Sequence, residues 1–135
     1  MRYVDDSALP EVTDQMLEDA LHRVRPYTIV VLKAGPRFEM PGPDRGGEVA
    51  KIIWQHGKRN FALRLAGIMP IVCPVADGSG ITGVGIFDAD PEEVERIMRE
   101  DPGVKAAIFT YEIHPTRGFP GSALPPPDRA AAEQG

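Results

Sequence analysis

The chain has 135 residues, of which 42% are hydrophobic, and this size and composition predict one globular domain with a true core. The formal net charge of −5 disfavours nucleic acid as a partner, because phosphate binding requires clustered lysine and arginine. Cys73 is the only cysteine, which excludes an intramolecular disulfide. No stretch reaches the roughly 20 apolar residues of a membrane span, and no signal peptide is recognisable. We therefore expect a cytoplasmic protein without a membrane partner.

A short accessory helix is predicted near the N-terminus, ahead of the main fold. Thr13 suits the N-cap position, because its side-chain oxygen can accept a hydrogen bond from a free backbone N–H. The apolar residues that follow at helical spacing form one stripe: Met16, Leu17, Ala20, Leu21 and Val24. The helix must end before Pro26, since the residue preceding a proline is driven out of the α region. Residues 1–26 are therefore assigned to this segment, outside the main domain.

The main domain is expected over residues 27–116 and begins with a strand at Tyr27–Ala34. The β-branched and apolar residues of this strand indicate burial on both faces. Gly35 and Pro36 end the strand, and the chain up to Gly47 is rich in proline, glycine and charge. A loop of this length in a compact domain is usually functional or mobile. We therefore consider it a candidate lid over a pocket.

The long helix of the domain is predicted over Glu48–Ala66. Its apolar residues and one histidine share a face at steps of three and four: Val49, Ile52, Ile53, His56 and Leu63. His56 therefore points toward the sheet. Gly57 follows directly and costs a helix roughly 1 kcal/mol relative to alanine, but it would allow a ligand or backbone to approach His56 closely. Gly67 is suited to end the helix.

Two strands are expected next, over Ile68–Val75 and Ile81–Asp88. The first contains two prolines, which predicts a place at the sheet edge or a bulge. In the second, Gly83 and Gly85 leave one face without side chains. This pattern predicts that another part of the chain packs closely on that face.

A second helix is predicted to start at Asp90-Pro91, where Asp90 can cap and proline suits the first helical position. Asp101-Pro102-Gly103 is expected to end it, and Val104–His114 to form the last strand, closed by Pro115. Residues 117–135 are assigned to a C-terminal extension whose proline-rich end is expected to be disordered.

The predicted order is an extra helix followed by β–α–β–β–α–β, which is the ferredoxin-like arrangement of an α+β domain. Each helix has a single apolar stripe, so both must cover the same face of the sheet. The opposite sheet face is also apolar and would be exposed in a single chain. We therefore expect a homodimer that buries this face between two copies.

His56 and Asp101 are the candidate catalytic residues. Imidazole has a reference pKa of about 6.5 and can exchange a proton near neutral pH. An acid at the C-terminal end of a helix faces the negative end of the helix dipole, so Asp101 is expected to need a compensating partner. A carboxylate paired with His56 would orient the ring and stabilise its charged form. The structural alternatives are a core histidine bonded to a backbone carbonyl and an aspartate that only shapes the turn.

Three further residues are predicted to bind substrate. Arg37 in the long loop can meet an anionic group or remain solvated, and Tyr111 on the last strand can face the pocket or the core. Asn60 lies one helical turn after His56. No metal is expected, because the three histidines lack ligand spacing. No cofactor is expected either, because no dinucleotide-binding glycine pattern follows a strand.

Two segments, Trp54-Gln55-His56 with the helix that follows, and Asp101-Pro102-Gly103-Val104-Lys105-Ala106-Ala107-Ile108-Phe109-Thr110-Tyr111-Glu112, resemble the YCII-related proteins. The resemblance covers roughly Tyr27–Pro115. It implies a ferredoxin-like dimeric α/β barrel with His56 and Asp101 in a pocket. Some members resemble dehydrochlorinase or muconolactone-isomerase-like enzymes that act on small ring compounds. The N-terminal helix, the long loop and the C-terminal extension depart from short members of the family.

We therefore expect a YCII-like enzyme, a lyase or isomerase, that uses the His56–Asp101 pair for proton transfer on a small organic, ring-shaped molecule. Acyl transfer is disfavoured, since no nucleophile is assigned beside the pair. The alternative is a non-catalytic protein that binds a small ligand or serves as accessory subunit of a larger enzyme. Haem or oxygen chemistry, as in other ferredoxin-like dimers, is a third alternative and predicts a coloured protein.

Overall fold

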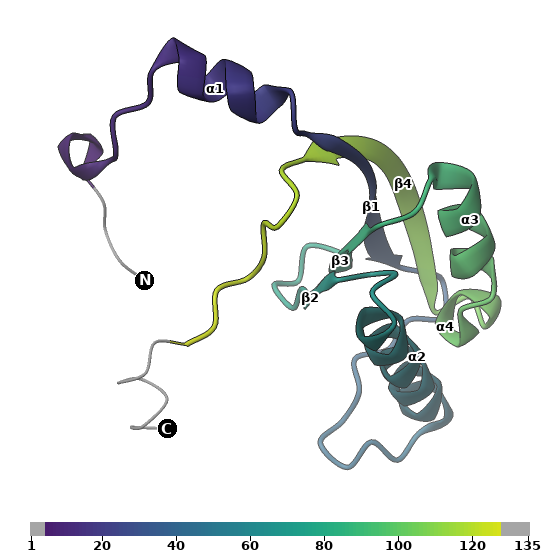
Figure 1. Cartoon of the computed structure of the whole chain (residues 1–135). Helices are drawn as coiled ribbons and strands as arrows, with labels where there is room; N and C mark the ends of the chain where they lie inside the picture. The colour runs from purple at the N-terminus through teal and green to yellow at the C-terminus, as the bar shows by residue number, and fades with distance from the viewer. Residues whose placement is uncertain (1–4, 128–135) are drawn as a thin grey trace.

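The computed structural model describes residues 5–127, and its centre is a four-stranded antiparallel sheet with the strand order β2-β3-β1-β4 (Figure 1). The elements in chain order are η1 (Asp6–Ala8), α1 (Asp14–Leu21), β1 (Arg25–Ala34), α2 (Glu48–Leu65), β2 (Ile71–Pro74), β3 (Ile81–Phe87), α3 (Pro91–Arg99), α4 (Pro102–Lys105) and β4 (Phe109–Gly118). The expected mixed α+β class is confirmed. None of the helices within residues 5–127 is long and apolar enough to cross a membrane.

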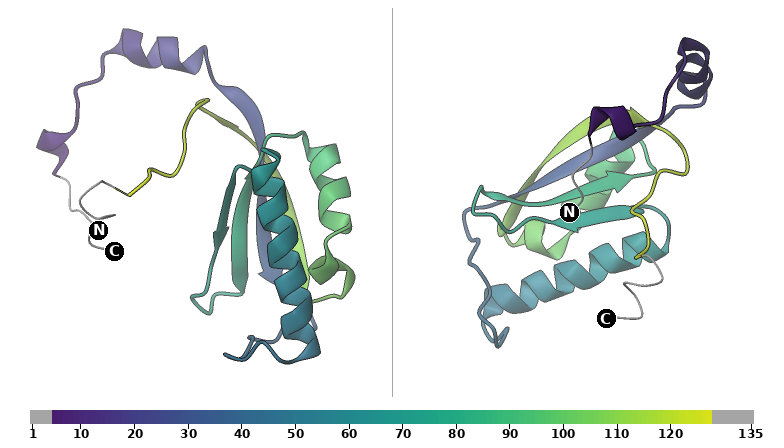
Figure 2. Two further views of the ribbon diagram at one scale, coloured as in Figure 1. Left: turned by 60° about the horizontal axis from the view of Figure 1, so that its bottom comes forward. Right: turned by 90° about the vertical axis from the view of Figure 1, so that its left-hand side faces the viewer.

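The domain has two layers, with α2 and α3 covering the same face of the sheet (Figure 2). The core lies between these layers and contains Val30, Phe87, Val94, Met98 and Ile108, all nearly inaccessible to solvent. Burying apolar side chains of this size is worth about 1.5–3 kcal/mol each, so this layer contact supplies most of the driving force for folding.

The two faces of β1 differ in burial. Thr28, Val30 and Leu32 are buried beneath the helices, whereas Ile29 and Val31 point to the opposite face and are only half-buried. The prediction that β1 is buried on both faces is therefore wrong for the single chain. The strand is apolar on both sides, but residues 5–127 of one chain supply a covering layer on one side alone.

The glycine face of β3 packs as the sequence predicted. A Cβ atom at Gly85 would lie 2.6 Å from the Sδ atom of Met69, a buried residue just before β2. Met69 therefore fills the space that the glycine leaves. The predicted edge position of β2 is confirmed, although the strand is shorter than expected.

The last strand differs from the prediction at both ends. Val104 belongs to the short helix α4, and β4 begins only at Phe109. The strand then continues through Pro115, which pairs with Thr28, to Gly118. Because β4 is an edge strand, a proline within it can turn its missing N–H toward the open side without breaking the ladder.

The segment before β1 stands clear of the two layers. Thr13 caps α1 as predicted, since its side chain accepts a hydrogen bond from the N–H of Met16. No residue of α1 is buried, and the helix projects away from the sheet in both figures. Most of the tail predicted to be disordered falls on residues 128–135, outside the described residues.

Two glycine substitutions test how closely the junction after β1 is packed. A Cβ atom at Gly35 would lie 2.7 Å from the carbonyl oxygen of Ala107, which is backbone and cannot move aside easily. We expect Gly35→Ala to lower the free energy of unfolding by about 1–3 kcal/mol. Gly57→Ala is the matched control, because a Cβ there meets nothing within 4 Å and the helix gains up to roughly 1 kcal/mol.

Urea unfolding of both variants and the unaltered protein measures these differences. A Gly35→Ala protein as stable as the unaltered chain would show that the junction between β1 and α4 is loosely packed.

Candidate functional site

His56 reaches the interior from the inner face of α2. Its side chain is buried, with 8% of the residue exposed, and its ring centroid lies 4.6 Å from that of Phe109 on β4. The helix is unbroken at Gly57, and Gly67 ends it with a φ of 75°. The inward direction of His56 inferred from helical spacing is therefore confirmed.

Asp101 occupies the N-cap of α4, not the C-terminal end of α3. Helix α3 ends at Arg99 with Glu100 as its C-cap, and the Oδ2 atom of Asp101 accepts hydrogen bonds from the N–H groups of Gly103 (2.9 Å) and Val104 (3.1 Å). The inference that Asp101 opposes a helix dipole is therefore wrong. Its carboxylate faces free N–H groups, which is the favourable end of a helix. The short helix was overlooked because its residues had been interpreted as the start of a strand.

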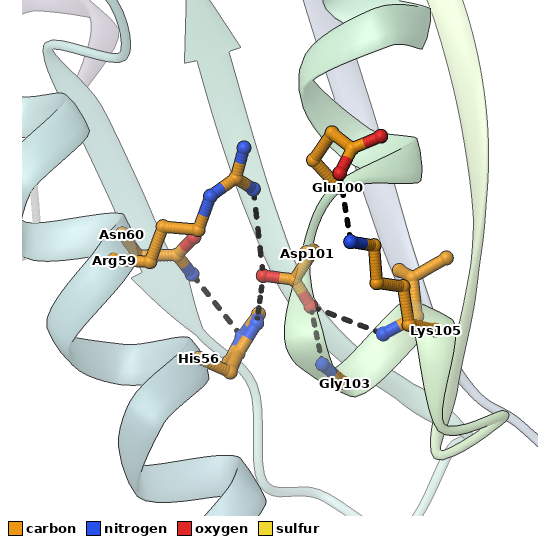
Figure 3. A network of polar contacts seen from close by, with 8 residues as sticks. His56, Arg59, Asn60, Glu100, Asp101, Gly103 and Lys105 are labelled. Carbon is orange, nitrogen blue, oxygen red and sulfur yellow. Dashed lines mark hydrogen bonds and ion pairs between the residues drawn. The ribbon is translucent and has the colours of Figure 1, made fainter.

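The two candidate catalytic side chains meet directly. The Nδ1 atom of His56 lies 2.8 Å from the Oδ1 atom of Asp101 (Figure 3). An ionised carboxylate can only accept hydrogen bonds, so Nδ1 is the nitrogen that carries the proton. In the neutral ring the Nε2 atom then keeps its lone pair, and the Nδ2 atom of Asn60 lies 3.1 Å from it, placed to donate.

The charge of Asp101 is compensated from several sides, as a carboxylate that is only 1% exposed requires. Besides the two N–H groups and the His56 ring, the Nη1 atom of Arg59 lies 3.8 Å from Oδ1. This Nη1 atom is itself buried and has no hydrogen-bond partner among residues 5–127. The guanidinium thus acts on Asp101 as a nearby charge. Together these groups fix the orientation and the tautomer of the imidazole.

A cleft of about 420 Å³ opens beside His56 and Asn60. Its walls include the aromatic rings of Phe38, Phe61 and Phe109. None of the described residues that line it is lysine, arginine, aspartate or glutamate. Phe38 comes from the long loop after β1, so the loop predicted to act as a lid does contribute to the wall.

The structure gathers some of the predicted substrate-binding residues and separates others. Asn60 lines the cleft together with His56. Arg37 instead donates a hydrogen bond to the carbonyl of Ala106 (3.2 Å), and the hydroxyl of Tyr111 donates to Glu95 on α3 (2.8 Å). Neither Arg37 nor Tyr111 lines the cleft.

Arg59 and the aromatic walls of the cleft were missed by the sequence analysis. Arg59 lies three positions after His56, and residues at that helical spacing are neighbours on the helix surface. This spacing was the available signal for Arg59. No comparable signal in the sequence marked Phe38 or Phe61. Phe38 lies in a loop, and Phe61 does not lie on the apolar face of α2 that includes His56.

No family model matches the sequence, and no curated protein matches it. The resemblance to the YCII-related proteins stays a prediction. Within residues 5–127, no group of three or more histidine, cysteine, aspartate or glutamate side chains comes together where a metal ion would bind.

Substitutions at Asp101 separate its capping role from its charge. Asp101→Ala removes the cap of α4 and leaves His56 and Arg59 without their buried partner, so we expect a loss of about 3–5 kcal/mol in unfolding free energy. Asp101→Asn keeps one acceptor oxygen and should lower the free energy of unfolding by about 1–3 kcal/mol. Asp90→Ala removes the exposed cap of α3 and should lower the free energy of unfolding by about 1 kcal/mol. The free energies of unfolding are measured in urea. Equal decreases for Asp90→Ala and Asp101→Ala would show that Asp101 contributes no more than a helix cap.

Tyr111 should lose its proton at a higher pH than an exposed tyrosine. Burial, followed by its hydrogen bond to Glu95, raises the pKa of Tyr111 from 10.0 to about 12. A raised folded-state pKa means that the stabilisation by the protonated phenol is complete below pH 10 and is lost as the pH rises toward 12. The ultraviolet absorbance of tyrosinate should therefore show a late step that Tyr111→Phe removes and Glu95→Gln moves to lower pH. A titration curve unchanged by Tyr111→Phe would contradict this assignment.

Proposed function

We propose that this chain is a YCII-like enzyme that binds an uncharged small molecule in the cleft beside His56 and transfers protons to or from it. The observation that carries the proposal is the buried His56–Asp101 pair, with 2.8 Å between Nδ1 and Oδ1, in contact with a cleft of about 420 Å³. A histidine oriented by a carboxylate is a common acid–base unit, because the ring can change its charge near neutral pH.

In this proposal Asp101 is the positioning residue and His56 the acid–base. The carboxylate holds the proton on Nδ1, which leaves Nε2 as the atom that accepts a proton from the substrate, and it stabilises the imidazolium that forms. Asn60 can serve both charge states of the ring. Its amide nitrogen donates to the neutral Nε2, and after protonation its carbonyl oxygen can turn to accept from Nε2–H.

The cleft wall supports an uncharged, ring-containing substrate. Phe38, Phe61 and Phe109 offer ring faces and edges for stacking, and no charged side chain lines the described cleft to neutralise an ionic ligand. When Asn60 moves away from Nε2, the polar atoms of His56 and Asn60 become available to fix the one reacting group. Because Arg37 is bonded elsewhere, an anionic substrate group is not part of this proposal.

We further propose a ferredoxin-like fold that dimerises through its open sheet face. The strand order β2-β3-β1-β4, with α2 and α3 on one face, supports the ferredoxin-like arrangement. The opposite face supports the dimer, since it presents half-buried apolar side chains from adjacent strands: Ile29, Val31, Ile71, Val84 and Ile86. A second copy would cover this surface.

One observation favours the alternative of a non-catalytic ligand-binding protein. Asn60 occupies the hydrogen-bonding position at Nε2, and only 8% of His56 is exposed. A substrate therefore reaches Nε2 only when Asn60 moves. If Asn60 stays in place, the network is rigid and the cleft binds without reacting.

The test is a thermal-shift screen of uncharged ring compounds against charged analogues, at pH values about one unit to either side of the histidine reference pKa of about 6.5. We expect the uncharged compounds to stabilise the protein. His56→Gln should remain folded and lose this response, whereas His114→Gln, at an exposed histidine of β4, should keep it. Stabilisation by charged compounds alone would contradict the proposed ligand class.

Exchange of carbon-bound hydrogen distinguishes catalysis from binding. In D2O the protein should incorporate deuterium into a bound compound that has an acidic C–H, and His56→Gln should lose this exchange by roughly 10²–10⁴-fold. Binding without any exchange, for every stabilising compound, would favour the non-catalytic alternative.

A further inference from the structure

The segment Asp5–Leu21, here called the acidic arm, has an apolar stripe that no other part of residues 5–127 covers. Met16, Leu17 and Leu21 on α1 are 54%, 49% and 51% exposed. The arm has no lysine or arginine, and its acidic residues are Asp5, Asp6, Glu11, Asp14, Glu18 and Asp19. The negative charge of these six acids exceeds the net charge of −5 of the whole chain. An apolar stripe bordered by acids is complementary to an apolar surface bordered by bases.

The outer face of α2 has these properties. Trp54, Phe61 and Leu65 are 50%, 56% and 70% exposed, and their spacing of seven and four residues places them on one stripe, here called the α2 stripe. Trp54 and Leu65 lie on the side of the helix opposite His56, whereas Phe61 also lines the cleft beside His56. Its border is basic and consists of Arg45, Lys51, Lys58 and Arg64.

Arginines already lie over the aromatic rings of the α2 stripe. The guanidinium carbon of Arg45 is 4.4 Å from the ring centroid of Trp54, and that of Arg64 is 5.9 Å from the ring of Phe61. A groove of about 600 Å³ runs beside Trp54 and is bordered by Lys51, Gln55 and Pro102. It is large enough to receive apolar side chains from a short helix. Its charged lining residues are two cations, Arg45 and Lys51, and one acid, Glu48.

We propose that the acidic arm of one copy docks on the α2 stripe of a second copy. Charge and apolar complementarity between two otherwise uncovered surfaces of the same chain carries this proposal. The arm does not lie on its own α2. Only His22–Val24 join α1 to β1, and α1 projects beyond the end of the sheet where β1 begins, whereas α2 lies along the face of the sheet. This contact is separate from the open sheet face, and it meets the cleft beside His56 at Phe61.

Trp54 allows a direct test, because it is the only tryptophan of the chain. An arm-defective copy carries Leu17→Glu and Leu21→Glu, which place charges in the apolar stripe and keep Trp54. A tryptophan-free copy carries Trp54→Phe and an intact arm. All three positions are exposed, so both proteins should fold, which circular dichroism checks.

When the tryptophan-free copy is titrated into the arm-defective copy, we expect the Trp54 emission to shift to shorter wavelength and to saturate. The control titrant carries Trp54→Phe together with Leu17→Glu and Leu21→Glu, and it should cause no shift. Dimerisation through the open sheet face alone leaves Trp54 in water and gives no shift either. Absence of a shift with the intact-arm titrant overturns the proposal.

Charge reversal tests the electrostatic part. Glu18→Lys in the arm and Lys58→Glu beside the α2 stripe should each raise the dissociation constant of this contact by up to about fivefold, and the two together should restore it partly. Gln15→Glu is the control, since it lies on the polar face of α1 and should not weaken binding. Equal affinity of all these variants in the titration overturns the assigned pairing of acidic and basic surfaces.

Discussion

The buried carboxylate of Asp101 is the constraint on which the rest of this structure depends. A carboxylate that is 1% exposed must be compensated by hydrogen bonds and opposite charge, or the folded chain loses several kcal/mol. Here the compensation comes from two elements at once: the N–H groups that begin α4, and His56 and Arg59 on α2. The carboxylate thereby joins the long helix to the connection between α3 and β4.

The same requirement creates the candidate site. Because Asp101 accepts from Nδ1, the Nε2 atom of His56 is left for Asn60 and for whatever enters the cleft. The ring of Phe109 beside His56 and the uncharged cleft walls complete an apolar setting around one polar pair. Stability and proposed chemistry thus rest on a single network, so substitutions at Asp101 act on both.

Prediction from sequence succeeded where the signal was local. Thr13 and Asp90 cap their helices, Gly67 ends α2, and the face occupied by His56 follows from helical spacing. It failed where a short element depended on its surroundings. The four-residue helix α4 is too short to show a periodic pattern, so its residues were assigned to β4, and Asp101 was attributed to the wrong helix end.

By itself, the sequence determined the α+β class, the inward direction of His56, the edge position of β2 and the close packing against the glycines of β3. The signal for each of these is local, such as the helical spacing of apolar residues, the two prolines near β2 and the two glycines of β3. Only the tertiary structure decided that Asp101 reaches His56 across 45 positions of the chain, that Asn60 and Arg59 join them, and that Arg37 and Tyr111 are bonded elsewhere. The physical reason is that a buried charge selects its partners by distance in space, and spacing along the chain does not record that distance.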